Sequence, residues 1–272
     1  MAINDISLTS GMRSNLLQLQ STATLLDRTQ TRLSTGKKVN TALDNPVNFF
    51  AAQGLNNRAS DLSALKDGMS EAIQTVKAAD NGITGITKLI ESAKGLAQAA
   101  RSADTTGREG LATQYGEILS QINTLAKDGS YKGTNLLDNQ KLTVTFNEKG
   151  TSSLVISGSS AGSTGLGLAG GATNNWASDT NITADVEKMT KALDKLRTTS
   201  SSLSGNLNII STRQEFTTNM INTLQTGADN LTLADMNEEG ANMLMLQTRQ
   251  SLGVTALSLS SQAAQSVMRL FG

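Results

Sequence analysis

The residues that most often carry out catalysis are missing from this chain of 272 residues. It contains no His, which removes the commonest general base and metal ligand, and no Cys, which removes thiolate nucleophiles, disulfides and Cys-based zinc sites. Two groups of residues remain that could do chemistry: a Gly-Lys step and a set of carboxylates near the carboxyl-terminal end.

The Gly-Lys step, Gly36-Lys37, resembles the end of a phosphate-binding loop. That motif also needs a Gly five residues before Gly36 and a Ser or Thr after the Lys, but this chain has Thr31 and Lys38 at those positions. The residues that would cradle a phosphate and hold magnesium are absent, so the sequence predicts no nucleotide site here.

The carboxylates do not match a metal motif either. Neighbouring Glu238 and Glu239 diverge on a helix, and no Asp-x-Asp-x-Asp-Gly loop surrounds them or the pair Asp229 and Asp235. We interpret these residues as the solvated start of a helix. The sequence therefore predicts a protein that is not an enzyme and has no cofactor or metal.

Charge and hydropathy limit the partners. Lys plus Arg equals Asp plus Glu at 23 each, which predicts no binding of nucleic acid or of anionic lipid. Residues 251–268 carry no charge but are too rich in Ser, Thr and Gln to span a bilayer, so we expect no membrane insertion. Residues 1–9 lack the basic and apolar regions of a signal peptide, so we expect no cleaved signal.

Two long heptad patterns predict the elements that position everything else. The first, over 46–101, begins where Asn45 can cap a helix and Pro46 can take its first position, and thirteen of its fourteen seam residues are apolar. The exception is Arg58, which either pairs with a carboxylate across the helices or sets their register; we favour register. The second pattern covers 183–232. We expect two antiparallel rods of matching length.

The segment between the rods predicts smaller elements. A short helix fits residues 111–125, and alternating apolar residues at 142–146 and 154–156 predict one β-hairpin around a turn at 147–150. Residues 157–179 are rich in Gly, Ser, Ala and Thr, and Trp176 is their one bulky aromatic, which indicates an exposed irregular loop. The fold class is thus mainly α: a coiled-coil-like bundle with one small β-hairpin and paired terminal helices.

Both ends of the chain carry an apolar stripe at alternating spacings of four and three residues. Such stripes are seams of helices that need helical partners, and isolated helices of this composition are marginal in water. We expect them to order when neighbouring chains cover them. The stripes comprise Met12, Leu16, Leu19, Ala23, Leu26, Gln30 and Leu33 at one end, and Met245, Arg249, Leu252, Ala256, Leu259, Ala263, Ser266 and Leu270 at the other.

Three blocks of sequence, in order, resemble bacterial flagellin over nearly the whole chain. The first reads RLSTGKKVN at 32–40 with LNNR at 55–58, the second YKGTNLL at 131–137, and the third covers 232–242 and 247–272, ending in VMRLFG. In length the chain is similar to the short flagellins of alphaproteobacteria. The residues that carry the family signature are Leu33, Ser34, Thr35, Gly36, Lys37, Asn40, Asp44, Arg58 and Gly133.

The resemblance implies a structural subunit that polymerises into an extracellular flagellar filament. Its implied partners are copies of itself, alone or with sister flagellins, the flagellar type III export apparatus, an export chaperone, and hook-associated and cap proteins. The implied segments are inner-tube helices at 1–40 and 236–272, rod segments at 41–140 and 182–235, and a surface region at 141–181. Inner-tube contacts are expected from Met12, Leu16, Leu19, Leu26, Leu33, Met245, Leu252, Leu259 and Leu270.

Some family members are sensed by an innate immune receptor through a patch like Leu-Gln-Arg-x-Arg-Glu-Leu. Here Ser92 and Lys94 replace the two Arg, and Gly95 replaces the Glu, so we expect weak activation of that receptor. The alternative interpretation is that these residues are ordinary solvated helix surface.

Two other functions stay open at this point. A hook–filament junction protein shares the terminal signatures, and the Asp-Asn-Pro step at 44–46 resembles one found there. A type III secreted translocator would instead insert its uncharged end into a host membrane.

Overall fold

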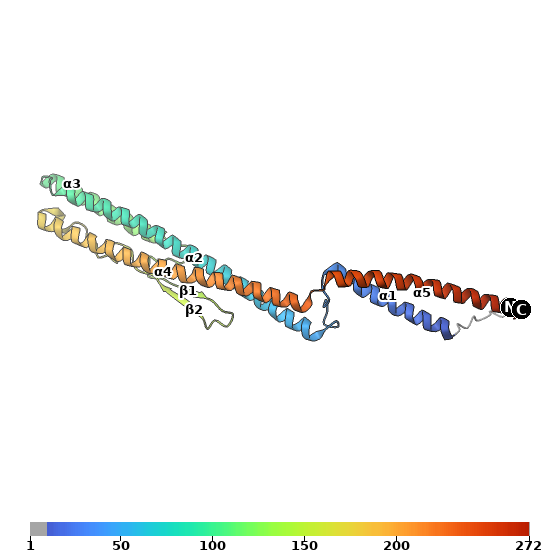
Figure 1. Ribbon diagram of the computed structural model, residues 1–272. Helices are drawn as coiled ribbons and strands as arrows, with labels where there is room; N and C mark the ends of the chain where they lie inside the picture. The colour runs from blue at the N-terminus through green and yellow to red at the C-terminus, as the bar shows by residue number, and fades with distance from the viewer. Residues whose placement is uncertain (1–9, 272) are drawn as a thin grey trace, which may run out of the picture. The chain divides into compact units, whose positions relative to one another are not determined.

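Five long helices account for most of the chain. The computed structural model describes residues 10–271, with the side chains of 267, 268, 270 and 271 left out of the description. The helices are α1 (Ser10–Thr35), α2 (Pro46–Ala100), α3 (Thr105–Asp128), α4 (Asp179–Thr232) and α5 (Met236–Phe271) (Figure 1). Contacts divide the chain into a terminal unit, residues 1–57 with 224–272, and a middle unit, residues 58–223. The predicted mainly α fold is confirmed.

In the middle unit, α2 and α4 run antiparallel, as predicted. Gln214 Nε2 donates to Ser70 Oγ at 2.6 Å, whereas Arg101 at the far end of α2 donates through Nη2 to Thr183 Oγ1 at 3.2 Å. Residue numbers therefore rise along α2 in the direction in which they fall along α4, as expected of an antiparallel pair.

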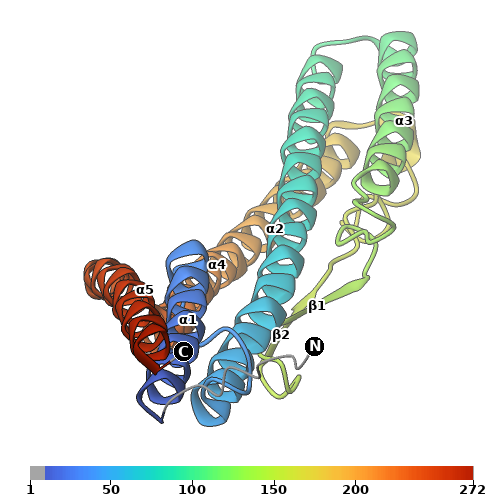
Figure 2. The ribbon, with the colours of Figure 1, turned by 90° about the vertical axis from the view of Figure 1, so that its right-hand side faces the viewer.

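The predicted heptad seams form the core of this unit. From α2, Met69, Ile86 and Ile90 are fully buried, and α4 contributes Met189 and Ile210. The predicted short helix is α3, which lies along α2 (Figure 2). A Cβ placed on Gly85 of α2 would come within 2.8 Å of Leu125 of α3, so the glycine permits close approach.

The hairpin also forms where the sequence predicts it. Strands β1 (Lys141–Thr145) and β2 (Ser153–Ser157) pair antiparallel, with Leu142 opposite Ile156. The expectation that Arg58 sets the helix register is wrong. Arg58 Nε donates to Glu148 Oε1 in the hairpin turn at 2.8 Å, and its side chain is 55% exposed, so it ties α2 to the hairpin from outside the seam.

The exposed loop predicted for residues 157–179 is a second correction. Trp176 in the short helix η1 (Thr173–Trp176) is fully buried, and its ring stacks on Tyr115 with 5.3 Å between centroids. Its Nε1 donates to the buried Asp185 carboxylate at 2.8 Å, which also accepts from Thr173 and from Lys188. Composition indicated a loop because Gly and Ser dominate it, but a few apolar residues and one carboxylate fix it to the helices.

Opposing effects act on the Asp185 carboxyl. Burial by itself would raise its pKa, but hydrogen bonds from Lys188, Thr173 and Trp176 favour the charged form and leave the pKa below its ordinary value. Burial and the nearby Asp185 charge together raise the pKa of the Tyr115 hydroxyl. Asp185 is thus an ionised hub for the segment between β2 and α4.

The signature residue Gly133 shapes the turn after α3. It has φ +82°, in the left-handed region that favours glycine, and Tyr131 and Thr134 exchange backbone hydrogen bonds of 2.9 Å around it. Asn135 then donates through Nδ2 to the carbonyl of Ala126, near the end of α3, at 2.8 Å. The second signature block is therefore a structural joint that starts the path to the hairpin.

In the terminal unit, α1 and α5 pair antiparallel, which confirms the predicted pairing of the terminal helices (Figures 1 and 2). Arg32, near the end of α1, contacts Glu239 at the start of α5. Earlier in α1, Leu19 lies beside Gly253.

Candidate functional site

The first signature block forms the connection between α1 and α2. Gly36 has φ +69° and its N–H bonds to the carbonyl of Arg32 at 2.8 Å, which ends α1 in a left-handed turn. Beyond it, Lys38 N donates to Thr232 O at 2.8 Å and Ala234 N donates to Gly36 O at 2.9 Å. The connector after α1 is thus paired to the connector before α5.

The rest of this block caps α2. The Asp44 carboxylate accepts from the backbone N–H groups of Thr41 at 2.9 Å and Asn40 at 3.1 Å, and these bonds lower the pKa of Asp44. Asn45 Oδ1 accepts from Asn48 N at 3.0 Å, and Pro46 occupies the first helical position, as predicted. The signature residues here hold the path of the backbone between α1 and α2.

The carboxylates at the start of α5 have a structural part. Asp235 Oδ1 caps the helix by accepting from Asn237 N at 2.9 Å. The expectation that Glu239 is solvated is wrong: its side chain is 8% exposed and pairs with Arg32 Nη1 at 2.7 Å. Across residues 10–271, no group of three or more possible metal ligands comes together.

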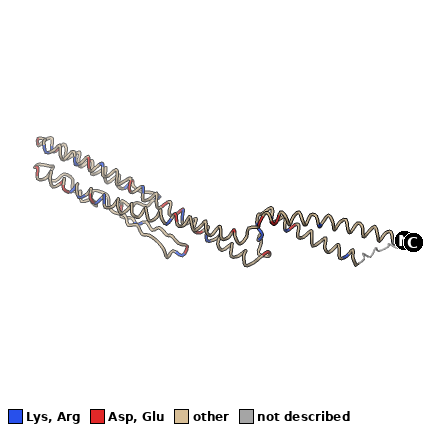
Figure 3. Tube along the Cα trace, in the orientation of Figure 1, with Lys and Arg blue, Asp and Glu red and all other residues tan. Residues whose placement is uncertain are grey.

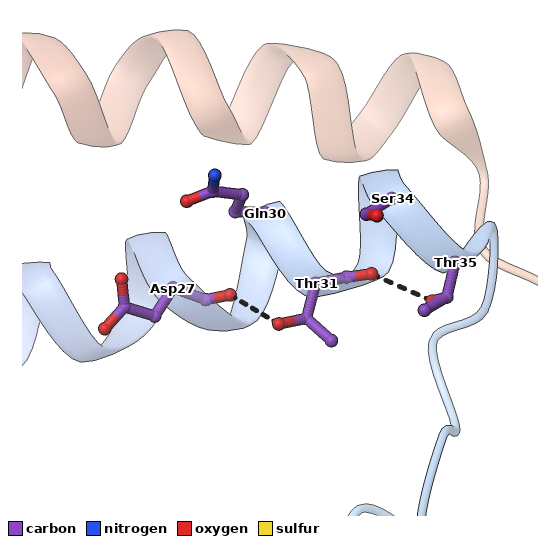
Figure 4. Close-up of a pocket in the computed structure, with 5 residues that line it drawn as sticks. All are labelled: Asp27, Gln30, Thr31, Ser34 and Thr35. Atoms are coloured by element: carbon purple, nitrogen blue, oxygen red, sulfur yellow. Dashed lines mark hydrogen bonds between the residues drawn. The ribbon is translucent and has the colours of Figure 1, made fainter.

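A shallow hollow on α1 contains two more signature residues, Ser34 and Thr35. Figure 4 shows its five lining side chains, all from this one helix. Thr31 Oγ1 donates to Asp27 O at 2.9 Å, and Thr35 Oγ1 donates to Thr31 O at 2.8 Å, so both hydroxyls are satisfied by the helix itself. The hollow presents no converging set of charged groups.

The seam between α1 and α5 combines large apolar residues with polar and small ones. On α1 the buried residues are Met12, Thr22 and Thr29. On α5 Leu246 is buried, and a Cβ on Gly253 would lie 3.1 Å from Leu19.

The predicted contact residues divide into two groups. Met12 is buried, and Leu19, Leu26 and Leu33 are half-buried, with Leu19 beside Gly253 of α5. The others are exposed: Leu16 is 38% exposed, Met245 45%, Leu252 65% and Leu259 61%. The side chain of Leu270 and all of residues 1–9 lie outside the described residues.

The face of α5 that meets α1 is therefore displaced by one residue from the predicted stripe. Glu239 and Leu246 are buried and Gly253 is half-buried, and these three share a heptad position next to the one that holds Met245, Leu252 and Leu259. The prediction selected α5 residues by hydrophobicity, and it missed this face because the face contains Glu239 and Gly253. The signal that could have found it is Gly253, since a small residue permits close helix approach.

Charge along the terminal helices is sparse. Between Gly240 and Phe271 the ionisable residues of α5 are Arg249 and Arg269. Figure 3 shows how few charged positions mark this helix compared with the middle unit. Within the described residues, no helix is long and apolar enough to cross a membrane.

These features define a coiled-coil-like helical protein whose terminal helices pair through a thin seam and leave large apolar side chains uncovered. Residues 3–142 match the family model of the bacterial flagellin N-terminal helical region. The chain belongs to the bacterial flagellin family. Members are structural subunits of the flagellar filament, and this chain is one of them.

Relatives align over most or all of the chain. Flagellin FljM of Caulobacter vibrioides is 30% identical over 100% of both chains. A flagellin of Brucella melitensis is 27% identical over 94% of this chain and 95% of its own, and flagellin C of Rhizobium meliloti is 24% identical over 90% and 92%. The crystal structure of Bacillus cereus flagellin aligns with a TM-score of 0.48 at 14% identity, covering 55% of this chain and 88% of that one.

Proposed function

We propose that the chain polymerises through its terminal unit, with α1 and α5 of many copies forming the inner tube of the filament. The observation that carries this proposal is the exposure of Met245, Leu252 and Leu259 on a helix that already has its intramolecular partner. A side chain of this kind gains roughly 1.5–3 kcal/mol on burial, so a row of them favours association with another chain.

The outer part of the filament is proposed to come from the middle unit. Its apolar seams are already buried within the chain, so it can contribute a folded rod without help from neighbours. The inner-tube segments are placed at 1–40 and 236–272, the rod segments at 41–140 and 182–235, and the surface region at 141–181.

Export and location follow from the same proposal. The chain leaves the cell through the flagellar type III apparatus without a cleaved signal peptide, with a chaperone as a further partner. It adds to the filament beneath a cap and beyond the hook-associated proteins, and it catalyses no reaction. The support for this part is family membership.

The experiment is seeded growth of filaments from purified chain. We expect full-length protein to extend short filament seeds, and a chain lacking residues 253–272 to stay monomeric with its middle unit still helical by circular dichroism. Filaments growing at the normal rate from the truncated chain would overturn the inner-tube role of α5. A short cap that stops growing in the full-length protein would favour a junction protein.

A further inference from the structure

A groove between α1 and α5 carries more positive charge than its surroundings. It has a volume of about 290 Å³, and its walls include Leu25, Arg28, Arg32, Met245, Leu246 and Arg249. Glu239 also lines it, but this carboxylate is already paired with Arg32. Three Arg against one Glu leave two positive charges without a matching acid in the groove.

All three of these Arg side chains have unmet capacity to donate hydrogen bonds. The side chains of Arg28 and Arg249 make no hydrogen bond or ion pair with any residue in the described range 10–271, and both are exposed. The Nε of Arg32 is buried and has no hydrogen-bond partner in the same range, although Nη1 binds Glu239. A buried guanidinium N–H without an acceptor is costly, so the groove is suited to a carboxylate.

The same unit also carries carboxylates without a counter-ion. Asp229 near the end of α4 and Glu238 in the first turn of α5 are exposed, and neither forms an ion pair among the described residues. With Asp235 they make a locally acidic turn between α4 and α5, whereas α5 beyond Gly240 carries Arg249 and Arg269 and no acid. The turn itself, residues 229–238, thus carries three acids and no base, although Lys37 and Lys38 of the paired connector lie beside it, and α5 is basic farther along.

One copy cannot join these two regions through Glu238 and Arg249. Eleven residues of α5 separate them, which is about 16 Å along the helix at 1.5 Å per residue. An ion pair needs a nitrogen–oxygen distance within about 4 Å, which these side chains cannot reach along one helix. Glu238 of the same chain therefore cannot pair with Arg249, whereas Glu238 of a second copy can.

We propose that the groove lined by Arg28, Arg32 and Arg249 receives the acidic turn, Asp229 to Glu238, of a second copy of this chain. This inference rests on the proposed polymerisation and names the polar contact that sets its register. Apolar stripes alone let helices slide by a heptad, whereas a charge pair at one position selects one alignment. The exposed edges of Leu25 and Met245 are covered when the turn enters.

A charge exchange tests this contact. Arg249→Glu should raise the critical concentration for seeded growth by at least about tenfold, equivalent to about 1.4 kcal/mol, and Asp229→Lys with Glu238→Lys should do the same. Combining all three substitutions should restore growth to within a few-fold of the unmodified chain. The defects of the separate variants should shrink in 1 M salt, which screens exposed charges.

Lys141→Glu is the matched control, since it makes the same change of charge at an exposed residue of the proposed surface region, away from the terminal unit. Circular dichroism of each monomer checks that the helices are unchanged. Growth of Arg249→Glu at the normal rate, or failure of the combined variant to recover with intact helices, would overturn the groove contact. If the unmodified chain itself does not extend seeds, the polymerisation proposal fails instead.

Discussion

Apolar heptads occur in both the middle and the terminal unit, but their residues differ in how fully the single chain buries them. In the middle unit the seam residues Ile86, Ile90 and Met189 are completely buried within one chain. In the terminal unit, two of the three buried residues of α1 are threonines, while Leu252 and Leu259 of α5 are more than half exposed. An apolar heptad therefore predicts burial but leaves open whether the partner is in the same chain.

The largest effect should come from polar substitutions in the exposed stripe. Leu252→Asp combined with Leu259→Asp places two charges where neighbouring copies pack, and we expect seeded filament growth to be lost. The thermal midpoint of the monomer should change by less than about 2 °C, because both side chains already face water. Loss of monomer stability would show that these residues serve the single chain, and the contrast between the units would fail.

Shortening a side chain in the core of the middle unit should have the opposite effect: a loss of monomer stability with little change in filament growth. Ile90→Ala removes a fully buried side chain from α2, and we expect it to cost about 2–5 kcal/mol of unfolding free energy in urea. Seeded growth at a temperature where the variant stays folded should be nearly normal. A small loss of stability, below about 1 kcal/mol, would mean that this seam also needs neighbouring chains.

Acid should act on the middle unit through Asp185. Its pKa is lowered in the folded protein, so its contribution to stability is fully present above the unfolded value of 3.8 and is lost as the pH falls through the lower folded pKa. At neutral pH Asp185→Asn should cost about 1–3 kcal/mol, because Lys188 loses its counter-ion. Below pH 4 the free energy of unfolding of the variant should depend less on pH than that of the unmodified chain. Trp176 fluorescence can follow the unfolding of both proteins. If the two proteins lost stability in parallel as the pH fell, the acid sensitivity would belong to another group.

The smallest structural effect is expected at the degenerate receptor patch. Ser92 and Gly95 are exposed on α2, and Lys94 Nζ lies 3.4 Å from Thr190 Oγ1. Substituting Ser92→Arg, Lys94→Arg and Gly95→Glu together should leave the thermal midpoint within a few degrees but increase receptor activation about tenfold or more in reporter cells. Equal potency of the original chain and an Arg-bearing flagellin would contradict the prediction of weak activation.

Much of the fold could be predicted because it depends on local pattern. The bounds of α2 and α4 follow from uninterrupted heptads, and the Asn45-Pro46 start follows from capping chemistry. The hairpin follows from alternation on either side of a turn. The segment 157–179 could not be predicted in this way, because its order depends on Trp176 meeting Tyr115 and Asp185, which lie on different helices.

The sequence by itself determined that this protein is helical, lacks His and Cys and has terminal seams with few charges, since composition and periodicity are local properties. Tertiary structure alone decided which side of α5 meets α1. The face with Gly253 permits the closer approach, so Leu246 is buried and Met245, Leu252 and Leu259 stay outside. It also decided that Arg58 reaches the hairpin and that Arg32 holds Glu239, because those partners lie far apart in the chain.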